Sequence, residues 1–269
     1  MFNRSRSGIA LGAAILSIPG LSLTPQAGYT QQIEEIVVSV RRRDENLQEV
    51  PLSVSTIGEE ELERFGINNT ADVVQYTAGL EFDEGFGAQD TRIVIRGLSP
   101  TRGRSNVAIL VDGIDFTGEA ISTAGGGLLV NQQLLDVQRV EVVKGPQSAL
   151  YGRSAFAGAL QYITKRPSLE ETEGTANVQF GNGKGANDAR FDFAYGGPVT
   201  DSFGLRANSL IYNRDGYYQN SLTGSDVGGA KGYGVALAGL FDRGGIFSST
   251  GRIAYSHDEY EPQAQARLL

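Results

Sequence analysis

The chain has 269 residues, of which 40% are hydrophobic and 20% are charged, which is enough to form one or two folded domains. Its net charge of −8 argues against a protein that binds nucleic acid through the phosphate backbone. There is no cysteine and a single histidine, His257, which excludes disulfides, thiolate metal sites and His-rich metal sites and leaves little acid–base chemistry for catalysis.

The first 27 residues have the three parts of a secretory signal peptide. Two arginines precede an apolar stretch over residues 8–23, and Ala27 offers a small side chain for cleavage. A membrane anchor is the alternative, but a spanning helix needs about 20 uninterrupted apolar residues, and Pro19 interrupts this stretch. We therefore expect residues 1–27 to be removed on export.

Residues 28–45 are too few and too polar to form a core of their own. A short β-branched run precedes a cluster of charged side chains at residues 41–45. On its own, this pattern predicts a first strand of the following domain with a solvated charged segment behind it. The run consists of Glu35, Ile36, Val37, Val38 and Ser39.

Residues 46–167 have the pattern of a small α+β domain. A helix is predicted over residues 59–65, ended by Gly66, and a second helix is predicted after Asn69, ended by Gly79. Asp112-Gly113 predicts a tight turn, and residues 145–152 predict a turn into a short helix. Strands are predicted at residues 92–96, 107–111, 139–143 and 159–163.

Residues 168–269 change character, because polar and apolar side chains alternate with a period of two. This zone alone fits both a transmembrane β-barrel and a soluble β-sandwich. About five strands are predicted, at residues 175–180, 189–195, 203–212, 233–241 and 248–255. Turns are predicted between them at residues 196–198, 213–216 and 243–245.

The order of motifs along the chain resembles the N-terminal portion of a TonB-dependent outer-membrane receptor. The most specific motif is the run VEVVKGPQSALYG over residues 140–152, followed by GAL at 158–160 and ITKRP at 163–167. Before it stand LQEVPLSV at residues 47–54, RIVIRG at 92–97 and ILVDG at 109–113. No single motif decides the matter, but their order over about 130 residues does.

The resemblance implies an incomplete membrane β-barrel, with its first five antiparallel strands, behind an N-terminal α+β plug domain. The implied organisation is a signal peptide (1–27), a periplasmic tether with a TonB box (28–45), a plug (46–167) and the start of the barrel (168–269). Because five strands cannot close a barrel, we expect the chain to be a fragment of a longer receptor or a truncated product.

The resemblance also implies partners and site residues. Glu35, Ile36, Val37, Val38 and Ser39 resemble the TonB box, which the inner-membrane energy-transducing protein TonB would bind by strand addition. Among plug loops, Phe86 offers an apolar contact, and Arg102 and Arg104 could pair with anionic oxygens of a substrate. The alternative is that both arginines are charged loop residues that contact only water.

The function implied is active uptake of a scarce nutrient across the outer membrane of a Gram-negative cell, most often a ferric siderophore. Cobalamin, haem and oligosaccharides are the other substrate classes of the family. The alternative from the residues alone is a secreted soluble α+β or β-rich protein that binds carbohydrate or acts in adhesion.

We expect no catalytic residues, no resident metal and no cofactor. A phosphate cradle at residues 144–148 is not supported, because the glycine spacing of neither nucleotide-binding motif is present. His257 is expected to be a solvated residue of a late strand and not a metal ligand. No nucleophile–base pair is identifiable, so an enzyme is not expected.

Overall fold

The computed structural model describes the chain at residues 37–39, 45–46, 48, 50–84, 91–98, 105–117, 133–183, 186–245 and 247–261. The expected signal peptide lies outside these residues. Within them, none of the helices has the length and apolar character needed to cross a membrane.

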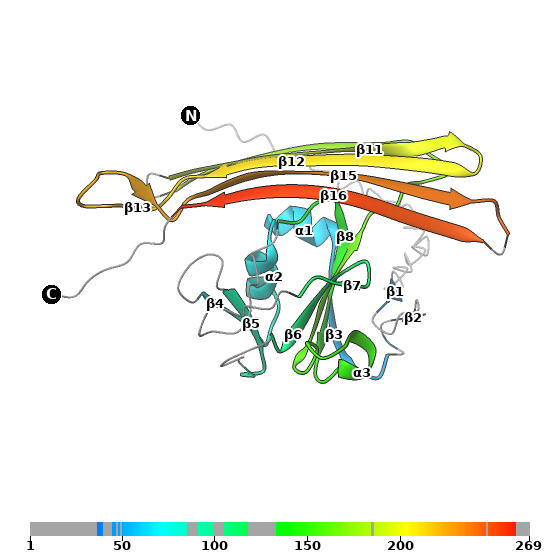
Figure 1. The fold of residues 1–269 in the computed structure, drawn as a ribbon, viewed down its shortest axis with the longest axis horizontal. Helices are drawn as coiled ribbons and strands as arrows, with labels where there is room; N and C mark the ends of the chain where they lie inside the picture. Colours follow the sequence, from blue (N-terminus) through cyan, green and yellow to red (C-terminus); the bar gives the residue numbers. More distant parts are fainter. Residues whose placement is uncertain are drawn as a thin grey trace, which may run out of the picture. The chain divides into compact units, whose positions relative to one another are not determined.

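A mixed sheet, here called the central sheet, organises the first part of the described chain (Figure 1). Neighbouring strands within this sheet run antiparallel to each other, except that β6 and β9 run parallel. Its middle strands are apolar because both of their faces are covered, and all seven residues of β9 are buried. The strands lie in the order β3 (Ser53–Gly58), β8 (Val137–Lys144), β9 (Gly158–Thr164), β6 (Val107–Val111) and β7 (Ile114–Asp115).

Two helices follow β3, where the sequence predicts them. Helix α1 (Glu59–Phe65) ends at Gly66, which adopts the left-handed conformation that glycine tolerates best. Helix α2 (Thr70–Tyr76) begins after Asn69, whose side chain accepts a hydrogen bond from the first turn. It ends before Gly79, earlier than predicted, because the backbone at Thr77 is already extended.

The helices and the central sheet share one apolar core. Burying these side chains removes apolar surface from water, the main source of stability in a domain of this size. The largest completely buried members lie on β5 (Thr91–Ile95), β6, β8, β9 and α2. The core includes Leu62, Val73, Ile93, Ile95, Val107, Val140 and Leu160.

Smaller elements complete this part of the chain. The predicted turn at Asp112-Gly113 joins β6 to β7 with positive φ at both residues. The Asp112 carboxylate accepts bonds from the backbone and hydroxyl of Thr164 instead of from its own turn. The remaining elements are the hairpin of β4 (Leu80–Glu84) with β5 (Thr91–Ile95), and the short helix α3 (Ser148–Tyr151).

Five strands between residues 173 and 260 form a second, antiparallel sheet, here called the meander sheet (Figure 1). The five strands fulfil the prediction, but they are longer than expected. The predicted turn at residues 196–198 is wrong, because these residues continue β11 and the pairing is only shifted near Pro198. The strands are β10 (Glu173–Gly183), β11 (Ala186–Thr200), β12 (Phe203–Arg214), β15 (Ala230–Asp242) and β16 (Ser248–Tyr260).

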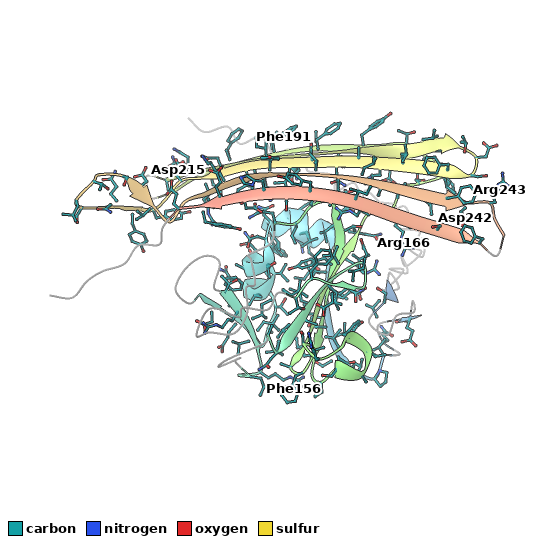
Figure 2. All side chains as sticks on the ribbon, in the orientation of Figure 1. Phe156, Arg166, Phe191, Asp215, Asp242 and Arg243 are labelled. Atoms are coloured by element: carbon teal, nitrogen blue, oxygen red, sulfur yellow. The ribbon has the colours of Figure 1, made fainter. Side chains whose placement is uncertain are left out.

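The two faces of the meander sheet differ in chemistry. One face, the outer face, carries large apolar side chains that are exposed, and Figure 2 shows Phe191 projecting from it. Such a continuous exposed apolar surface is typical of strands that face lipid. The outer face includes Val178, Phe191, Phe193, Tyr195, Ile211, Tyr233, Val235, Leu237, Ile253 and Tyr255.

The two ends of the meander sheet also differ. Asp215 and Arg243 lie at opposite ends (Figure 2). The connection that begins at Asp215 is the longer one and contains a small hairpin of β13 (Tyr218–Gln219) with β14 (Asp226–Val227). Because outer-membrane barrels have long external loops and short periplasmic turns, we assign the Asp215 end as external.

Candidate functional site

The segment of residues 37–39, here called the coupling segment, is docked on the central sheet. Strand β1 (Val37–Val38) pairs with β2 (Glu45–Asn46), within the segment where the sequence predicts a first strand. Val38 is completely buried against Val50 and Val143. Apolar burial and strand pairing therefore hold the segment in place before any partner binds. Glu35 and Ile36, the first two residues of the expected TonB box, lie outside the described part of the chain.

A buried carboxylate fixes the end of the coupling segment. Glu141 lies in β8 and is 0% exposed. Both of its oxygens accept hydrogen bonds from the backbone N–H of Ser39, at 3.1 Å each, and the Ser39 hydroxyl lies 3.3 and 3.4 Å from them. Hydrogen bonds to an ionised group are stronger than neutral ones, particularly away from water.

Two neighbours complete this cluster. Arg139, on the same strand, donates from Nε to Glu141 Oε1 at 2.8 Å and supplies the opposite charge that a buried carboxylate requires. Gln161 faces Glu141 across the β8–β9 pairing and donates weakly, at 3.5 Å, to the Ser39 hydroxyl. The Gln161 Oε1 atom is buried without a hydrogen-bond partner. The cluster thus connects the coupling segment to the two middle strands of the sheet.

The end of β8 carries a second electrostatic feature. Burial lowers the pKa of Lys144 below its ordinary value, and the nearby positive charge of Arg96 lowers it further. The backbone at Arg96 has a positive φ of 52°, beside Gly97 with 74°. The positive charges of Lys144 and Arg96 therefore repel each other at this end of β8.

Residues 133–136, here called the anchor segment, bind the inner face of the meander sheet. Asp136 and Arg206 form a bidentate ion pair at 2.7 and 2.8 Å, with side chains that are 6% and 2% exposed. Asn208 also donates to Asp136, at 2.9 Å. Asp136 has a positive φ of 55°, so the backbone is held in a conformation that aspartate seldom adopts.

Two further arginines hold the backbone of the anchor segment. Arg190 of β11 donates to the carbonyl oxygen of Leu134 at 2.8 Å and to the Gln133 side chain at 2.9 Å. Arg252 of β16 donates to the carbonyl oxygen of Leu135 at 3.2 Å. The anchor segment is therefore fixed to three strands of the meander sheet just before the chain enters β8.

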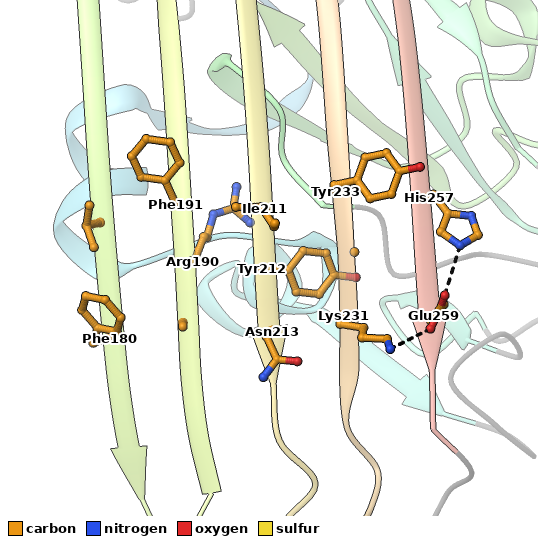
Figure 3. A pocket seen from close by; sticks show the side chains of 13 residues that line it. Phe180, Arg190, Phe191, Ile211, Tyr212, Asn213, Lys231, Tyr233, His257 and Glu259 are labelled. Carbon is orange, nitrogen blue, oxygen red and sulfur yellow. Dashed lines mark hydrogen bonds and ion pairs between the residues drawn. The ribbon is translucent and has the colours of Figure 1, made fainter.

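The predicted substrate contacts, Phe86, Arg102 and Arg104, all lie outside the described residues. In the ranges that are described, no group of three or more His, Asp or Glu side chains is placed to hold a metal ion. His257 lies in β16, as expected for a late strand, with its side chain half exposed and beside Glu259 (Figure 3).

Sequence reasoning placed Glu141 only within a motif and did not assign it a contact. The available signal was a charged residue between two valines in the run Val140-Glu141-Val142, at a position where a buried strand should be apolar. A charge in such a place requires a specific partner. The arginines of the meander sheet gave a weaker signal, because polar residues are expected on one face of any half-exposed strand.

Comparison with known proteins places this geometry in context. Residues 46–159 match the family model described as the TonB-dependent Receptor Plug Domain. The chain is 33% identical over 199 residues to the vitamin B12 transporter BtuB of Vibrio vulnificus, covering 71% of this chain and 30% of that protein. It is 28% identical over 195 residues to the iron-regulated outer membrane virulence protein of Vibrio cholerae. That match covers 69% of this chain and 28% of that protein. The chain thus spans about a third of the length of these relatives.

Solved structures share the fold. The ferric yersiniabactin uptake receptor FyuA from Yersinia pestis has a TM-score of 0.64 and 22% identity, covering 77% of this chain and 32% of that one. The ferripyoverdine receptor of Pseudomonas aeruginosa has a TM-score of 0.66 and 19% identity. That match covers 82% of this chain and 27% of the receptor chain. Both likenesses extend over more than three quarters of this chain.

Proposed function

Because this chain belongs to the TonB-dependent outer-membrane receptors, we propose that it takes part in the active uptake of a scarce nutrient across the outer membrane. The similarities that support this proposal are to a family of transport receptors. The apolar outer face of the meander sheet argues against the alternative of a secreted soluble protein, since so much exposed apolar surface favours aggregation in water.

The docked coupling segment is the observation that carries the proposal. A TonB-like partner would bind this segment from the periplasm through main-chain hydrogen bonds, as strand addition requires. Among the described strands, β1 pairs only with β2, and because Val38 is completely buried, the segment must leave its dock before a partner strand can add to it. A pull on Ser39 would reach β8 directly, because Glu141 joins the two.

We favour a ferric siderophore as the substrate. Support comes from receptors with the same fold whose ligands are ferric yersiniabactin and ferripyoverdine. Cobalamin is the competing candidate, supported by the 33% identity to a vitamin B12 transporter. In this proposal Arg102 and Arg104 bind carboxylate or catecholate oxygens of the iron chelate, since guanidinium groups suit planar anions, and Phe86 adds an apolar contact.

The test compares binding of anionic ferric siderophores and of cyanocobalamin to the receptor in outer membranes. The double variant Arg102→Ala, Arg104→Ala should bind a ferric siderophore about tenfold more weakly, which corresponds to about 1.4 kcal/mol. Arg243→Ala, at the opposite end from the external connection, is the matched control. Binding of cyanocobalamin alone would reject the siderophore proposal, and unchanged siderophore affinity in the double variant would reject these arginines as ligands.

A further inference from the structure

A buried glutamine lies beside the docked coupling segment and finds few hydrogen-bond partners there. Gln161, in the middle of β9, is 5% exposed. Its Nε2 atom donates a weak bond, at 3.5 Å, to the hydroxyl of Ser39. Within the part of the chain that the structure describes, its Oε1 atom is buried and accepts no hydrogen bond. A buried polar atom without a partner costs free energy, so the docked state carries a penalty at this residue.

The register of the central sheet explains why Gln161 has no better partner. In β6 it faces Leu110, which is apolar and buried. In β8 it faces Glu141, whose carboxylate accepts bonds from the backbone N–H and hydroxyl of Ser39 and from Arg139 Nε. With these donors in place, the Gln161 amide donates to Ser39 and not to the carboxylate opposite it.

Departure of the coupling segment changes the partners of both side chains. Glu141 loses the donors of Ser39, and Gln161 loses the acceptor of its Nε2 atom. Residues directly opposite each other in an antiparallel pair have Cβ atoms about 5 Å apart, which a glutamine amide and a glutamate carboxylate can bridge. A hydrogen bond to the ionised carboxylate is stronger than the weak neutral contact that it replaces. Water that enters the vacated space can also donate to Gln161 Oε1.

We propose that Gln161 favours release of the coupling segment, because its amide takes the place of Ser39 on Glu141 when the segment leaves. Gln161 is thus a positioning residue that acts through Glu141. Arg139 keeps its bond to the carboxylate in both states, so Glu141 is not left without a counter-charge. Burial of Val38 and the bonds between Ser39 and Glu141 act in the opposite direction and favour docking.

The role of Gln161 in uptake rests on the proposed function, because a partner that adds a strand needs the segment released. A segment that is held too firmly reaches this partner slowly, so the Gln161 amide should speed energised uptake. The docking equilibrium, in contrast, is a property of the receptor without its partner. It can therefore be measured separately from uptake.

The test is hydrogen-exchange mass spectrometry of the receptor without its energy-transducing partner. Gln161→Met keeps the length and flexibility of the side chain and removes the amide. Exchange of the Ser39 amide should become about tenfold slower, because the docked state loses an unsatisfied atom and the released state loses a donor to Glu141. A glutamine that merely held Ser39 in place would give the opposite result, since its removal would speed exchange. Gln75→Met, at an exposed position of α2, is the matched control and should change nothing.

The double variant Glu141→Ala, Gln161→Met tests whether Gln161 acts through Glu141. In the Glu141→Ala background, the change at Gln161 should slow Ser39 exchange by clearly less than tenfold, because no carboxylate remains to accept the amide. The full tenfold slowing there would overturn the transfer of the amide to Glu141. Ser39 exchange that is unchanged or faster in Gln161→Met would overturn the proposal. Gln161→Leu provides the same comparison if Gln161→Met does not reach the outer membrane.

Uptake measured on the same variants separates this proposal from the proposed function. Slower Ser39 exchange together with slower energised uptake in Gln161→Met supports both. Slower exchange with uptake at the wild-type rate supports the role of Gln161 in docking and contradicts the need for release in uptake. Unchanged exchange, combined with loss of uptake in Val37→Pro, overturns the role of Gln161 and leaves the proposed function standing.

Discussion

The backbone N–H of Ser39 donates to both carboxylate oxygens of the buried Glu141, at 3.1 Å each. The segment that precedes the plug is thereby attached to a strand in the middle of the central sheet and not to its surface. Val38 adds an apolar contact beside this bond. Release of the segment must break a charge-assisted hydrogen bond and expose a valine.

The first prediction concerns this bond. Glu141→Ala removes the acceptor and leaves the Ser39 N–H and Arg139 without their partner, so the coupling segment should open more often. The Ser39 amide should exchange its hydrogen about tenfold faster, as expected for loss of about 1.4 kcal/mol. Hydrogen-exchange mass spectrometry of the receptor measures this.

The control is Glu81→Ala, which removes an exposed carboxylate on β4. It should leave exchange of the coupling segment unchanged. Equal exchange at Ser39 in the wild type and in Glu141→Ala would show that Glu141 does not hold the segment.

A second prediction concerns the ion pair between Asp136 and Arg206. Arg206→Ala should destabilise the contact by about 3–5 kcal/mol, because it leaves a buried carboxylate without a counter-charge. The double variant Arg206→Met, Asp136→Asn should recover most of this loss, since it leaves neither charge behind and asparagine tolerates the positive φ at this position. Hydrogen exchange of the amides at the start of β8 reports the change. A loss as large in the double variant as in Arg206→Ala would contradict the role assigned to the pair.

Gly158, at the start of β9, supplies a third prediction. Its φ is +156°, and a Cβ atom there would overlap the carbonyl oxygen of Val143 and crowd Ile95. Gly158→Ala should therefore cost on the order of 3 kcal/mol and lower the amount of receptor that reaches the outer membrane. Gly58→Ala is the control, because its Cβ would meet no atom within 4 Å. Equal membrane levels of both variants, measured by quantitative immunoblotting, would contradict this account.

A fourth prediction concerns pH. Burial raises the pKa of the Asp72 carboxyl above its ordinary value, although the N–H groups of Asn68 and Asn69 partly offset the shift. The folded state then binds this proton more tightly than the unfolded chain. The resulting stabilisation is complete below the unfolded pKa of about 4 and is lost as the pH rises through the folded pKa.

Local opening of α2 should accordingly become easier as the pH rises from about 4 through the raised pKa of folded Asp72. Asp72→Asn should remove this dependence, because asparagine does not titrate and can still accept the capping bonds. Hydrogen exchange of α2 in the variant and the wild type, compared at each pH, measures the difference. The same pH dependence in both would exclude Asp72 as its source.

The helix ends and the meander strands were predicted correctly because their signals lie in residues that are close in the sequence. Gly66 marks the end of α1 because it adopts the left-handed conformation there, and Asn69 marks the start of α2 because its side chain accepts a hydrogen bond from the first turn. Both effects involve only residues that are close in the sequence. The meander strands were recognisable from their alternation alone. The failure at Gly196-Gly197-Pro198 has a non-local cause, since a Cβ on Gly196 would lie 2.7 Å from that of Arg206 on the next strand. These glycines permit close strand approach and do not form a turn.

The candidate site was harder to predict because its contacts join residues that are far apart in the chain. Ser39 and Glu141 are separated by 102 positions, and Asp136 and Arg206 by 70. Alternation shows that Arg206 and Phe191 face opposite sides of a sheet, but not which loop Arg206 binds. The pairing of β1 with β2 was likewise unforeseen, because two-residue strands leave no periodic signal.

The most direct test of the account measures energised uptake through a receptor that carries Val37→Pro. Proline removes a backbone donor from β1, so strand addition by the energy-transducing partner should fail while the external substrate site is untouched. Uptake of a radiolabelled ferric siderophore by whole cells should fall to the level of cells that lack the receptor, with binding to outer membranes unchanged. Uptake at the wild-type rate in this variant would contradict the assignment of the coupling segment.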